Sequence, residues 1–217
     1  MKISKAEFDK RYANGTLNIA FIGMSNIGKS YTALRLATRY DFKLIEVDKI
    51  IWENLGHDSM EAFAQWQGHP YSEGYQTRET HSISLESAAT SQALKNKSKN
   101  PLIDTTGSVI YIDDKVLERL IQNFYIVYIE AMEDHIERLK VQYFKHPKPL
   151  IWAGHYKKLD DMSETESIMQ CYPRLLSARA ESYAKIADVT LPSTTILNPD
   201  VKIEDIYKAL QLSLIHI

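Results

Sequence analysis

The sequence predicts an α/β protein in which helices cover both faces of a parallel sheet, a three-layer αβα arrangement. Two observations support this class: short β-branched runs alternate with longer helical stretches, and several of the short runs are apolar on both faces, as strands inside a parallel sheet are. The predicted strands are residues 17–23, 42–48, 101–107, 124–130 and 187–192, and the predicted helices are 29–40, 72–96, 113–122 and 132–144.

The chain ends are expected to flank a single domain over residues 17–195. Residues 1–16 form an N-terminal extension with a short helix, in which Ser4 and Glu7 have the spacing of a capping box and Asn14-Gly15 ends the helix. Residues 145–162 are polar and basic, with prolines and no clear period, so they are predicted to form a mobile lid. Residues 196–217 are expected to form a C-terminal helix.

Composition argues against several classes of partner. The chain has 217 residues with 26 basic and 28 acidic side chains, a net charge of −2, which predicts no nucleic-acid partner. No run reaches the eighteen apolar residues of a membrane span, so no membrane partner is expected. The single cysteine, Cys171, and the polar N-terminus predict a cytoplasmic protein. We expect a monomer or a homodimer.

The strongest motif is the P-loop GxxxxGKS at residues 23–30, between a predicted strand and a predicted helix. Its glycines allow a tight turn in which backbone N–H groups, aided by the helix N-terminus, hold phosphate oxygens. Lys29 is expected to reach the β and γ phosphates, and Ser30 to place its hydroxyl on Mg²⁺. The motif therefore predicts that the chain binds ATP with Mg²⁺.

Three carboxylates lie toward the carboxyl ends of predicted strands. Asp104 ends the run LeuIleAsp and is the expected second contact to the metal, although it could instead cap the turn at Thr105. Glu46 and Asp48 are two residues apart, so on a strand they would share a face and look into the crevice at the carboxyl end of the sheet. The alternative for Glu46 and Asp48 is a solvated loop pair.

The order of these motifs resembles that of shikimate kinases and related small-molecule P-loop kinases over about residues 17–192. After the P-loop, the resemblance rests on FKLIEVDKIIWENLG, PLIDTTGSVIY, KPLIWAG and RLLSARAESYAKIADVTLP. It implies that Asp48 holds the acceptor hydroxyl and helps to deprotonate it, that Arg179 contacts the substrate near the transferred phosphoryl group, and that Lys148 replaces the lid arginine. The expected nucleotide-binding residues are Gly23, Ser25, Asn26, Ile27, Gly28, Lys29, Ser30, Tyr31, Arg138 and Lys148.

Two departures from the family pattern concern the acceptor. The family has an aromatic residue, a carboxylate-binding arginine and a glutamate, and the best match to them here is Tyr75, Gln76 and Glu79. Gln76 replaces the arginine, and an amide cannot pair with a carboxylate as a guanidinium does. Arg78 takes that role only if the register differs. The family's three-glycine substrate loop is replaced by Thr105-Thr106-Gly107, which narrows the site.

The sequence therefore predicts a kinase that uses ATP and Mg²⁺ to phosphorylate a small hydroxylated acceptor other than shikimate. A nucleotide-binding regulatory module without kinase activity, a divergent shikimate kinase and a general nucleotide hydrolase are the alternatives. The expected catalytic residues are Lys29, Asp48 and Arg179, the metal ligands Ser30 and Asp104, and the substrate-binding residues Glu46, Asp48, Gln76, Glu79, Thr105, Thr106, Gly107 and Arg179.

Overall fold

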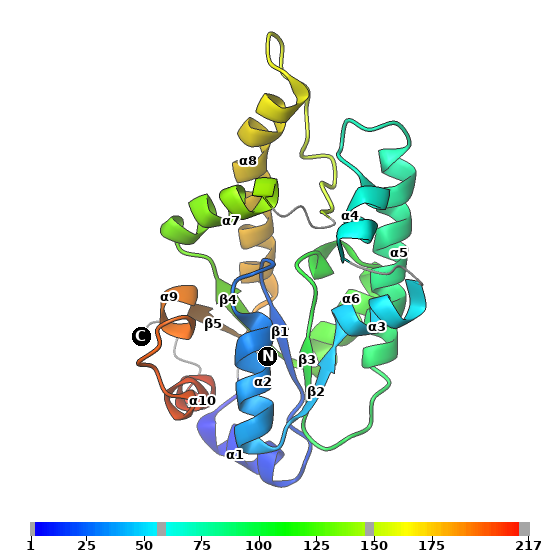
Figure 1. Cartoon of the computed structure of the whole chain (residues 1–217). Helices are drawn as coiled ribbons and strands as arrows, with labels where there is room; N and C mark the ends of the chain where they lie inside the picture. Colours follow the sequence, from blue (N-terminus) through cyan, green and yellow to red (C-terminus); the bar gives the residue numbers. More distant parts are fainter. Residues whose placement is uncertain (1–2, 56–59, 146–149, 213–217) are drawn as a thin grey trace.

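A five-stranded parallel sheet lies at the centre of the fold, in the order β2-β3-β1-β4-β5 (Figure 1). The structure is a computed structural model that describes residues 3–55, 60–145 and 150–212. The predicted three-layer α/β class is confirmed. The strands are β1 (Ile19–Ile22), β2 (Lys43–Glu46), β3 (Pro101–Asp104), β4 (Tyr125–Glu130) and β5 (Val189–Pro192).

Side chains alternate between the two faces of the sheet and fill two separate cores. On β1, Ile19 and Phe21 pack into one core while Ala20 and Ile22 pack into the other. The first core is covered by α1 (Lys5–Ala13), α2 (Lys29–Tyr40), α9 (Ser193–Ile196) and α10 (Ile203–Leu212). The second is covered by α5 (Tyr75–Ala93), α6 (Asp114–Asn123), α7 (Glu133–Lys145) and α8 (Glu164–Ile186), with the short helix η1 (Val109–Tyr111).

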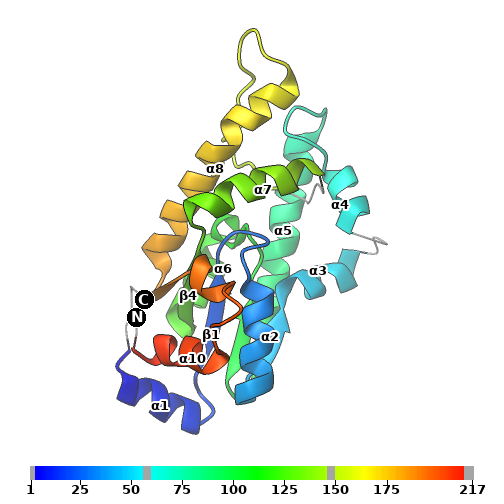
Figure 2. The ribbon, with the colours of Figure 1, turned by 60° about the vertical axis from the view of Figure 1, so that its left-hand side comes forward.

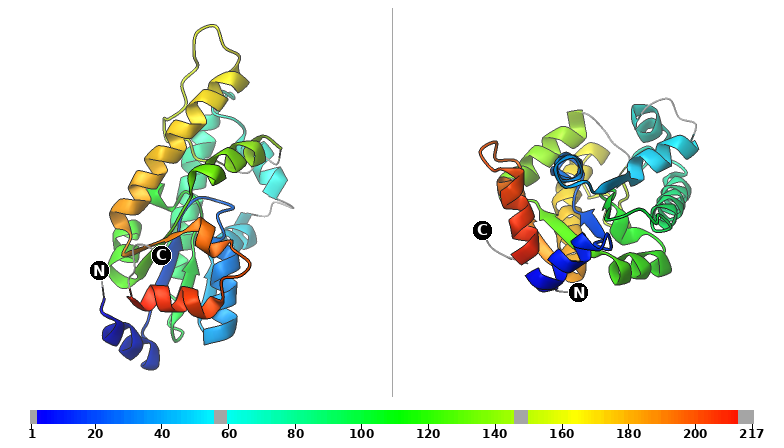
Figure 3. Two further views of the ribbon diagram at one scale, coloured as in Figure 1. Left: turned by 90° about the vertical axis from the view of Figure 1, so that its left-hand side faces the viewer. Right: turned by 90° about the horizontal axis from the view of Figure 1, so that it is seen from below.

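The helix α8 is long and extends past the carboxyl ends of the strands, and α1 lies beside α10 at the opposite end of the molecule (Figures 2 and 3). A complete capping box starts α8, because the Ser163 side chain and the Glu166 side chain each bond the other residue's backbone N–H. No helix in the described part of the chain is long and apolar enough to cross a membrane.

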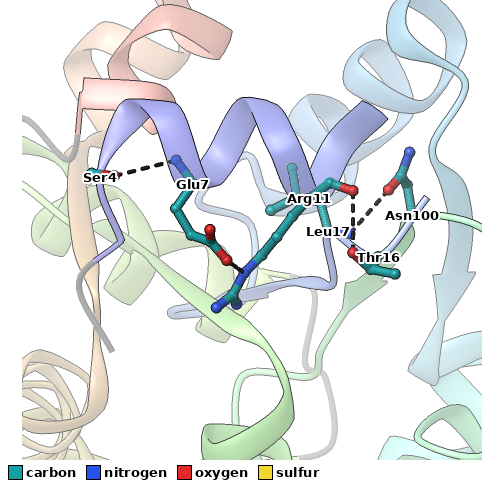
Figure 4. Close-up of polar contacts among 6 residues, drawn as sticks. All are labelled: Ser4, Glu7, Arg11, Thr16, Leu17 and Asn100. Atoms are coloured by element: carbon teal, nitrogen blue, oxygen red, sulfur yellow. Dashed lines mark hydrogen bonds and ion pairs between the residues drawn. The ribbon is translucent and has the colours of Figure 1, made fainter. Parts of the chain in front are cut away.

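The N-terminal helix begins and ends where the sequence predicts. The Ser4 hydroxyl accepts a hydrogen bond from the Glu7 backbone N–H at 3.2 Å, which caps the first turn (Figure 4). The Glu7 carboxylate accepts from Arg11 at 2.7 Å, one turn along the helix. Helix α1 ends at Ala13, and Gly15 follows in the left-handed region at φ 73°.

The N-terminal segment belongs to the core of the molecule. Phe8 is fully buried and packs edge-on against Tyr125 of β4 and Tyr207 of α10. The Asn100 side chain, just before β3, accepts from the backbone N–H of Leu17 and donates to the carbonyl of Tyr12, both at 3.0 Å (Figure 4 shows the first bond). Helix α1 therefore helps to fix the start of β1, which leads into the P-loop.

The main departures from the predicted elements are the long helix α8, which was not predicted, and the segment after the second strand. The strand predicted over 42–48 ends at Glu46, and the chain turns helical at Val47 to form α3 (Val47–Leu55), followed by α4 (Met60–Gln67). Neither helix was predicted. The prediction that Glu46 and Asp48 share a strand face is therefore wrong, since Glu46 is the last residue of β2 and Asp48 lies in the first turn of α3.

Candidate active site

The P-loop occupies the turn between β1 and α2, as its spacing predicts. Gly23 has φ 137°, and a Cβ there would lie 2.6 Å from the carbonyl oxygen of Ile129 on the neighbouring strand, so the turn requires glycine. Gly28 is the N-cap of α2 and supplies no side-chain cap. The backbone N–H groups of the first turn of α2 and the helix dipole are therefore suited to hold an anion.

Lys29 is enclosed by the loop it follows. Its ammonium group donates to the carbonyls of Gly23 at 3.0 Å and Met24 at 2.9 Å, and the residue is only 6% exposed. The side chain of Ile27 packs into the core on the α2 face of the sheet, so Ile27 can contribute to phosphate binding only through its backbone. The loop thus places one cation where the phosphates of a nucleotide bind.

Asp104 lies at the end of β3, which pairs with β1 and so brings this carboxylate beside the start of the P-loop. It is 5% exposed, and its Oδ1 is buried without a hydrogen-bond partner. Burial raises the pKa of Asp104, while Lys29 and a hydrogen bond from Ser30 oppose that rise. A hydroxyl and a carboxylate oxygen without a partner fit Mg²⁺, which prefers oxygen ligands and takes its remaining ligands from phosphates and water.

Lys29 and Ser30 line a cavity of about 590 Å³ that runs from the P-loop to the helices α3, α4 and α5, whereas Asp104 lies outside its lining. We call the part formed by the P-loop, α2, α7 and the residue after α9 the nucleotide end, and the part formed by α3, α4, α5 and the loop after β3 the acceptor end. The nucleotide end is lined by Ser25, Asn26, Gly28, Lys29, Ser30, Tyr31, Gln142 and Leu197. The acceptor end is lined by Asp48, Ile51, Trp52, Phe63, Gln67, Ser82, Glu86, Thr105, Thr106, Gly107, Ser108 and Ile151.

Side chains at the nucleotide end offer a surface for a flat base. Tyr31 is 55% exposed and Leu197 is 41% exposed, and both line the cavity. Asn26 donates to the Gln142 side chain of α7 at 3.3 Å, which links the P-loop to that helix. Arg138, predicted to clamp a phosphate, lies on the exposed side of α7 and outside the cavity lining; Gln142, one turn later, is the α7 residue that lines it.

At the acceptor end, the structure keeps one of the two predicted carboxylates. Asp48 lies in the first turn of α3 and lines the cavity. Glu46, the last residue of β2, is exposed and lies outside the lining, so its predicted contact with substrate is not supported by the geometry. Trp52, one turn after Asp48, and the buried Phe63 of α4 add an aromatic wall.

Glu86 is a carboxylate at the acceptor end that the sequence analysis did not select. It is 4% exposed, accepts a hydrogen bond from the Ser108 hydroxyl at 2.6 Å, and accepts another from Thr106. Burial raises the pKa of Glu86 to about 7; Asp48 adds to the rise, whereas Ser108, Arg179 and Lys29 oppose it. A carboxyl group with a pKa near neutrality in a cavity is typical of a functional site.

The loop Thr105-Thr106-Gly107 follows β3 and lines the cavity as predicted, but its hydroxyl groups are engaged by the protein. Thr105 donates to the Phe21 carbonyl of β1 at 2.7 Å, and Thr106 donates to Glu86. Gly107 passes so close to the P-loop that a Cβ would lie 2.9 Å from the backbone nitrogen of Ser25. A side chain at position 107 would therefore displace the phosphate-binding loop.

The predicted contact of Gln76 with the acceptor is not supported by the geometry of α5. Gln76 is exposed in the first turn of α5 and does not line the cavity, and Arg78 donates to the backbone carbonyl of Gln67 instead. The residues of α5 that line the cavity are Ser82 and Glu86, about two turns further along.

The first turn of α5 binds part of the predicted lid. The Tyr75 hydroxyl donates to the Leu150 carbonyl at 2.8 Å, and the Glu79 carboxylate accepts from the backbone N–H groups of Trp152 and Ala153. We call residues 150–153 the anchored segment. The mobile lid over 145–162 stays a prediction, and the predicted cation Lys148 lies outside the described residues.

Arg179 of α8 joins the anchored segment to the floor of the cavity. It is 3% exposed and donates to the Gly107 carbonyl at 2.9 Å and to the Ile151 carbonyl at 2.6 Å. Its guanidinium also lies 5.4 Å from the centre of the Tyr111 ring. Arg179 does not line the main cavity, so in this structure it positions the backbone of two residues that do.

Glu86 could have been found from the spacing of small residues in α5. The residues buried along this helix recur at helical intervals: Tyr75, Ser82, Glu86, Ala89, Thr90 and Ala93. A glutamate on the same helical face as serine and alanines is expected to be buried. This spacing is a weak signal for Glu86, because polar residues also interrupt the buried face of α5. The other cavity-lining residues that the sequence did not predict belong to no motif: Trp52, Phe63, Gln142 and Leu197.

Comparison with known proteins identifies the family. The sequence model of the shikimate kinase family matches residues 25–210, most of the chain. No curated protein matches the sequence.

Solved structures agree with the fold. A shikimate kinase from Acinetobacter baumannii in complex with shikimate is 20% identical, with a TM-score of 0.63, covering 93% of this chain and 96% of that one. A shikimate kinase from Bacteroides thetaiotaomicron is 18% identical with a TM-score of 0.61, and one from Aquifex aeolicus is 17% identical with a TM-score of 0.58. Both matches cover 90% of this chain and 96% of the other. The chain thus belongs to the shikimate kinase family and is an ATP-dependent small-molecule kinase.

Proposed function

We propose that this chain transfers the γ-phosphoryl group of ATP to a hydroxyl group of a small metabolite bound at the acceptor end. The observation that supports the proposal most directly is that one cavity holds the P-loop lysine, Lys29, at one end and the carboxylate of Asp48 at the other. A nucleotide and a small acceptor can therefore meet between a cation and a proton acceptor. Cytoplasmic location and a monomeric or homodimeric state stay predictions of the sequence.

In the proposed reaction the acceptor oxygen attacks the γ-phosphorus, the O–P bond forms, and the bond to the β,γ-bridging oxygen breaks with release of ADP. Asp48 orients the acceptor hydroxyl and accepts its proton. Lys29 and the backbone N–H groups at the start of α2 stabilise the negative charge on the phosphoryl oxygens. Arg179 holds the carbonyls of Gly107 and Ile151, and so fixes the cavity around the reacting groups.

The metal site would be formed by Ser30 and Asp104, whose oxygens fit Mg²⁺. When bound, Mg²⁺ supplies charge neutralisation between the β and γ phosphates. The buried Oδ1 of Asp104 without a partner supports this assignment over a role for Asp104 as a turn cap.

Shikimate is the first acceptor to assay, because the chain belongs to the shikimate kinase family and the Acinetobacter baumannii relative has been solved with shikimate. The argument from Gln76 for a different acceptor does not apply to this structure, since Gln76 lies outside the cavity.

Thermal melting and a coupled assay of ADP release test the proposal. Saturating ATP with Mg²⁺ is expected to raise the melting temperature of the wild type by about 5 °C, because a ligand that binds only the folded state stabilises it. Lys29→Ala is expected to remove most of that gain, while the exposed α3 variant Glu53→Gln keeps it. ADP release should depend on an added hydroxylated compound, such as shikimate or a sugar.

Two results would contradict different parts of the proposal. An unchanged melting temperature with millimolar ATP would show that the P-loop does not bind nucleotide. A normal rise in melting temperature, combined with no acceptor-dependent ADP release across acids, neutral polyols and amino sugars, would instead identify a nucleotide-binding module without kinase activity.

A further inference from the structure

The loop after β3 packs directly against the phosphate-binding loop at Gly107. A Cβ on Gly107 would lie 2.7 Å from the Ser25 hydroxyl oxygen and 2.9 Å from the Ser25 backbone nitrogen, so there is no room for a side chain between the two loops. Ser25 lines the nucleotide end of the cavity and Gly107 lines the acceptor end. The position of Gly107 therefore limits where the P-loop backbone at Ser25 can lie.

Glu86 of α5 holds the two residues that flank Gly107 in the chain. Its carboxylate accepts a hydrogen bond from the Thr106 hydroxyl on one side of the glycine and from the Ser108 hydroxyl, at 2.6 Å, on the other. The Thr106 hydroxyl also accepts from the Ser108 backbone N–H at 3.2 Å. Glu86 is only 4% exposed, so these bonds lie in a largely dry environment where a lost partner is costly.

Helix α8 holds Gly107 itself, but only at one atom. Arg179 donates to the Gly107 carbonyl oxygen at 2.9 Å, and the Tyr183 hydroxyl donates to the same oxygen. Contacts to a single oxygen leave the segment free to pivot about that point. The bonds of Glu86, one before and one after the glycine, supply the further attachments that fix its orientation.

The charge of Glu86 acts on a nucleotide in the opposite direction from its hydrogen bonds. Glu86 lines the same cavity as Lys29 and is close enough to interact with it electrostatically. An ionised carboxylate in that cavity repels the phosphates of a nucleotide. Removal of the charge alone is therefore expected to tighten nucleotide binding, whereas removal of the hydrogen bonds is expected to weaken it.

Resting on the proposed binding of ATP at the P-loop, we infer that Glu86 is a positioning residue for the nucleotide. It acts through the hydroxyls of Thr106 and Ser108, which keep Gly107 packed against Ser25. Without these bonds the two hydroxyls lose their buried partner and the loop after β3 shifts relative to the P-loop. The N–H groups that hold the phosphates are then less well preorganised, and the affinity for ATP falls.

Titration with a non-hydrolysable ATP analogue and Mg²⁺ at pH 8 compares two uncharged replacements of Glu86. Glu86→Gln keeps an amide that can hydrogen-bond both hydroxyls, whereas Glu86→Leu is similar in size and has no polar side-chain atom. The analogue is expected to bind Glu86→Gln at least as tightly as the wild type, and to bind Glu86→Leu about tenfold less tightly than Glu86→Gln. Glu53→Leu, an exposed substitution on α3, should bind it like the wild type.

A second comparison tests the route through the loop. Thr106→Val combined with Ser108→Ala removes both hydroxyls and is expected to weaken binding of the analogue about tenfold. Added to Glu86→Leu, the same pair should cause little further loss, because both changes break the same contacts. Urea unfolding establishes that each variant is folded before its binding is compared. If Glu86→Leu does not fold, the loop variant and the wild type carry the test.

Three results overturn the inference. Equal or tighter binding to folded Glu86→Leu than to Glu86→Gln would show that Glu86 affects the nucleotide by its charge alone, or only supports the fold. Unchanged binding by the folded loop variant would exclude the two hydroxyls, and additive losses in the combined variant would show that Glu86 acts by another route. Failure of the wild type to bind the analogue would instead refute the proposed nucleotide site.

Discussion

Glu86→Gln is expected to make the protein more stable above neutral pH, although it alters a residue of the acceptor site. Burial raises the pKa of Glu86 from an ordinary value of 4.5 to about 7. Because a tenfold change in proton affinity is worth about 1.4 kcal/mol, ionising the buried carboxyl lowers the free energy of unfolding by about 3 kcal/mol. Glutamine has no charge to bury, and its amide can still hydrogen-bond the hydroxyls of Thr106 and Ser108.

The pH range follows from the two pKa values. Below pH 4.5 Glu86 is protonated in both the folded and the unfolded chain, so the wild type and Glu86→Gln should have similar stability. Between about pH 4.5 and 7 only the folded state keeps the proton, so the stability of the wild type falls relative to the variant as pH rises. Above pH 7 the difference is complete.

Urea unfolding at pH 4, 5, 6, 7 and 8 measures this effect. The difference in midpoint between Glu86→Gln and the wild type should grow to roughly 1 M at pH 8, given an ordinary dependence of stability on urea. Glu53→Gln, which changes an exposed carboxylate, should show no such trend. A difference that stays constant from pH 4 to pH 8 would falsify the assignment of a raised pKa to Glu86.

Two further substitutions test the site. Asp48→Asn is expected to lower the rate of phosphoryl transfer by about 10² or more with little change in the dissociation constant of ATP, since it removes a positioned proton acceptor. Glu53→Gln is the control on the same helix. An equal loss of ATP affinity in Asp48→Asn would place Asp48 on the metal. Arg179→Lys is expected to lower the free energy of unfolding by about 2 kcal/mol or more and to reduce turnover. The reason is that an ammonium group cannot keep the planar geometry that joins the carbonyls of Gly107 and Ile151. An unchanged urea midpoint and unchanged turnover would contradict this role.

The parts of the fold with a strong local signal were predictable. The five strands and the helix after the P-loop follow from apolar runs and from glycines that only one kind of turn accommodates, such as Gly23. The position of Asp104 beside the P-loop could also be predicted, because parallel strands end at the same edge of the sheet and β3 pairs with β1. For the strands, for the helix after the P-loop and for Asp104, a short stretch of sequence is enough to determine the position in the fold.

The acceptor end was predicted less well because its geometry depends on contacts between distant segments. The helix α3 begins at Val47, whose burial in the core overrides the strand-like run before it. The register of α5 depends on where its first turn binds the anchored segment, and this was not readable from the match of Tyr75, Gln76 and Glu79 to a family pattern. Glu86, two turns further on, was missed for the same reason.

The position of Arg179 has a consequence for how the binding of one substrate affects the binding of the other. Its guanidinium joins Gly107, which abuts the phosphate-binding loop at Ser25, to Ile151, which borders the acceptor end. A displacement of either wall by one substrate is therefore transmitted to the wall that faces the other. Thermodynamic linkage requires that, if ATP alters the affinity for the acceptor, the acceptor alters the affinity for ATP by the same factor. We therefore expect the dissociation constant measured for either ligand to depend on the concentration of its partner.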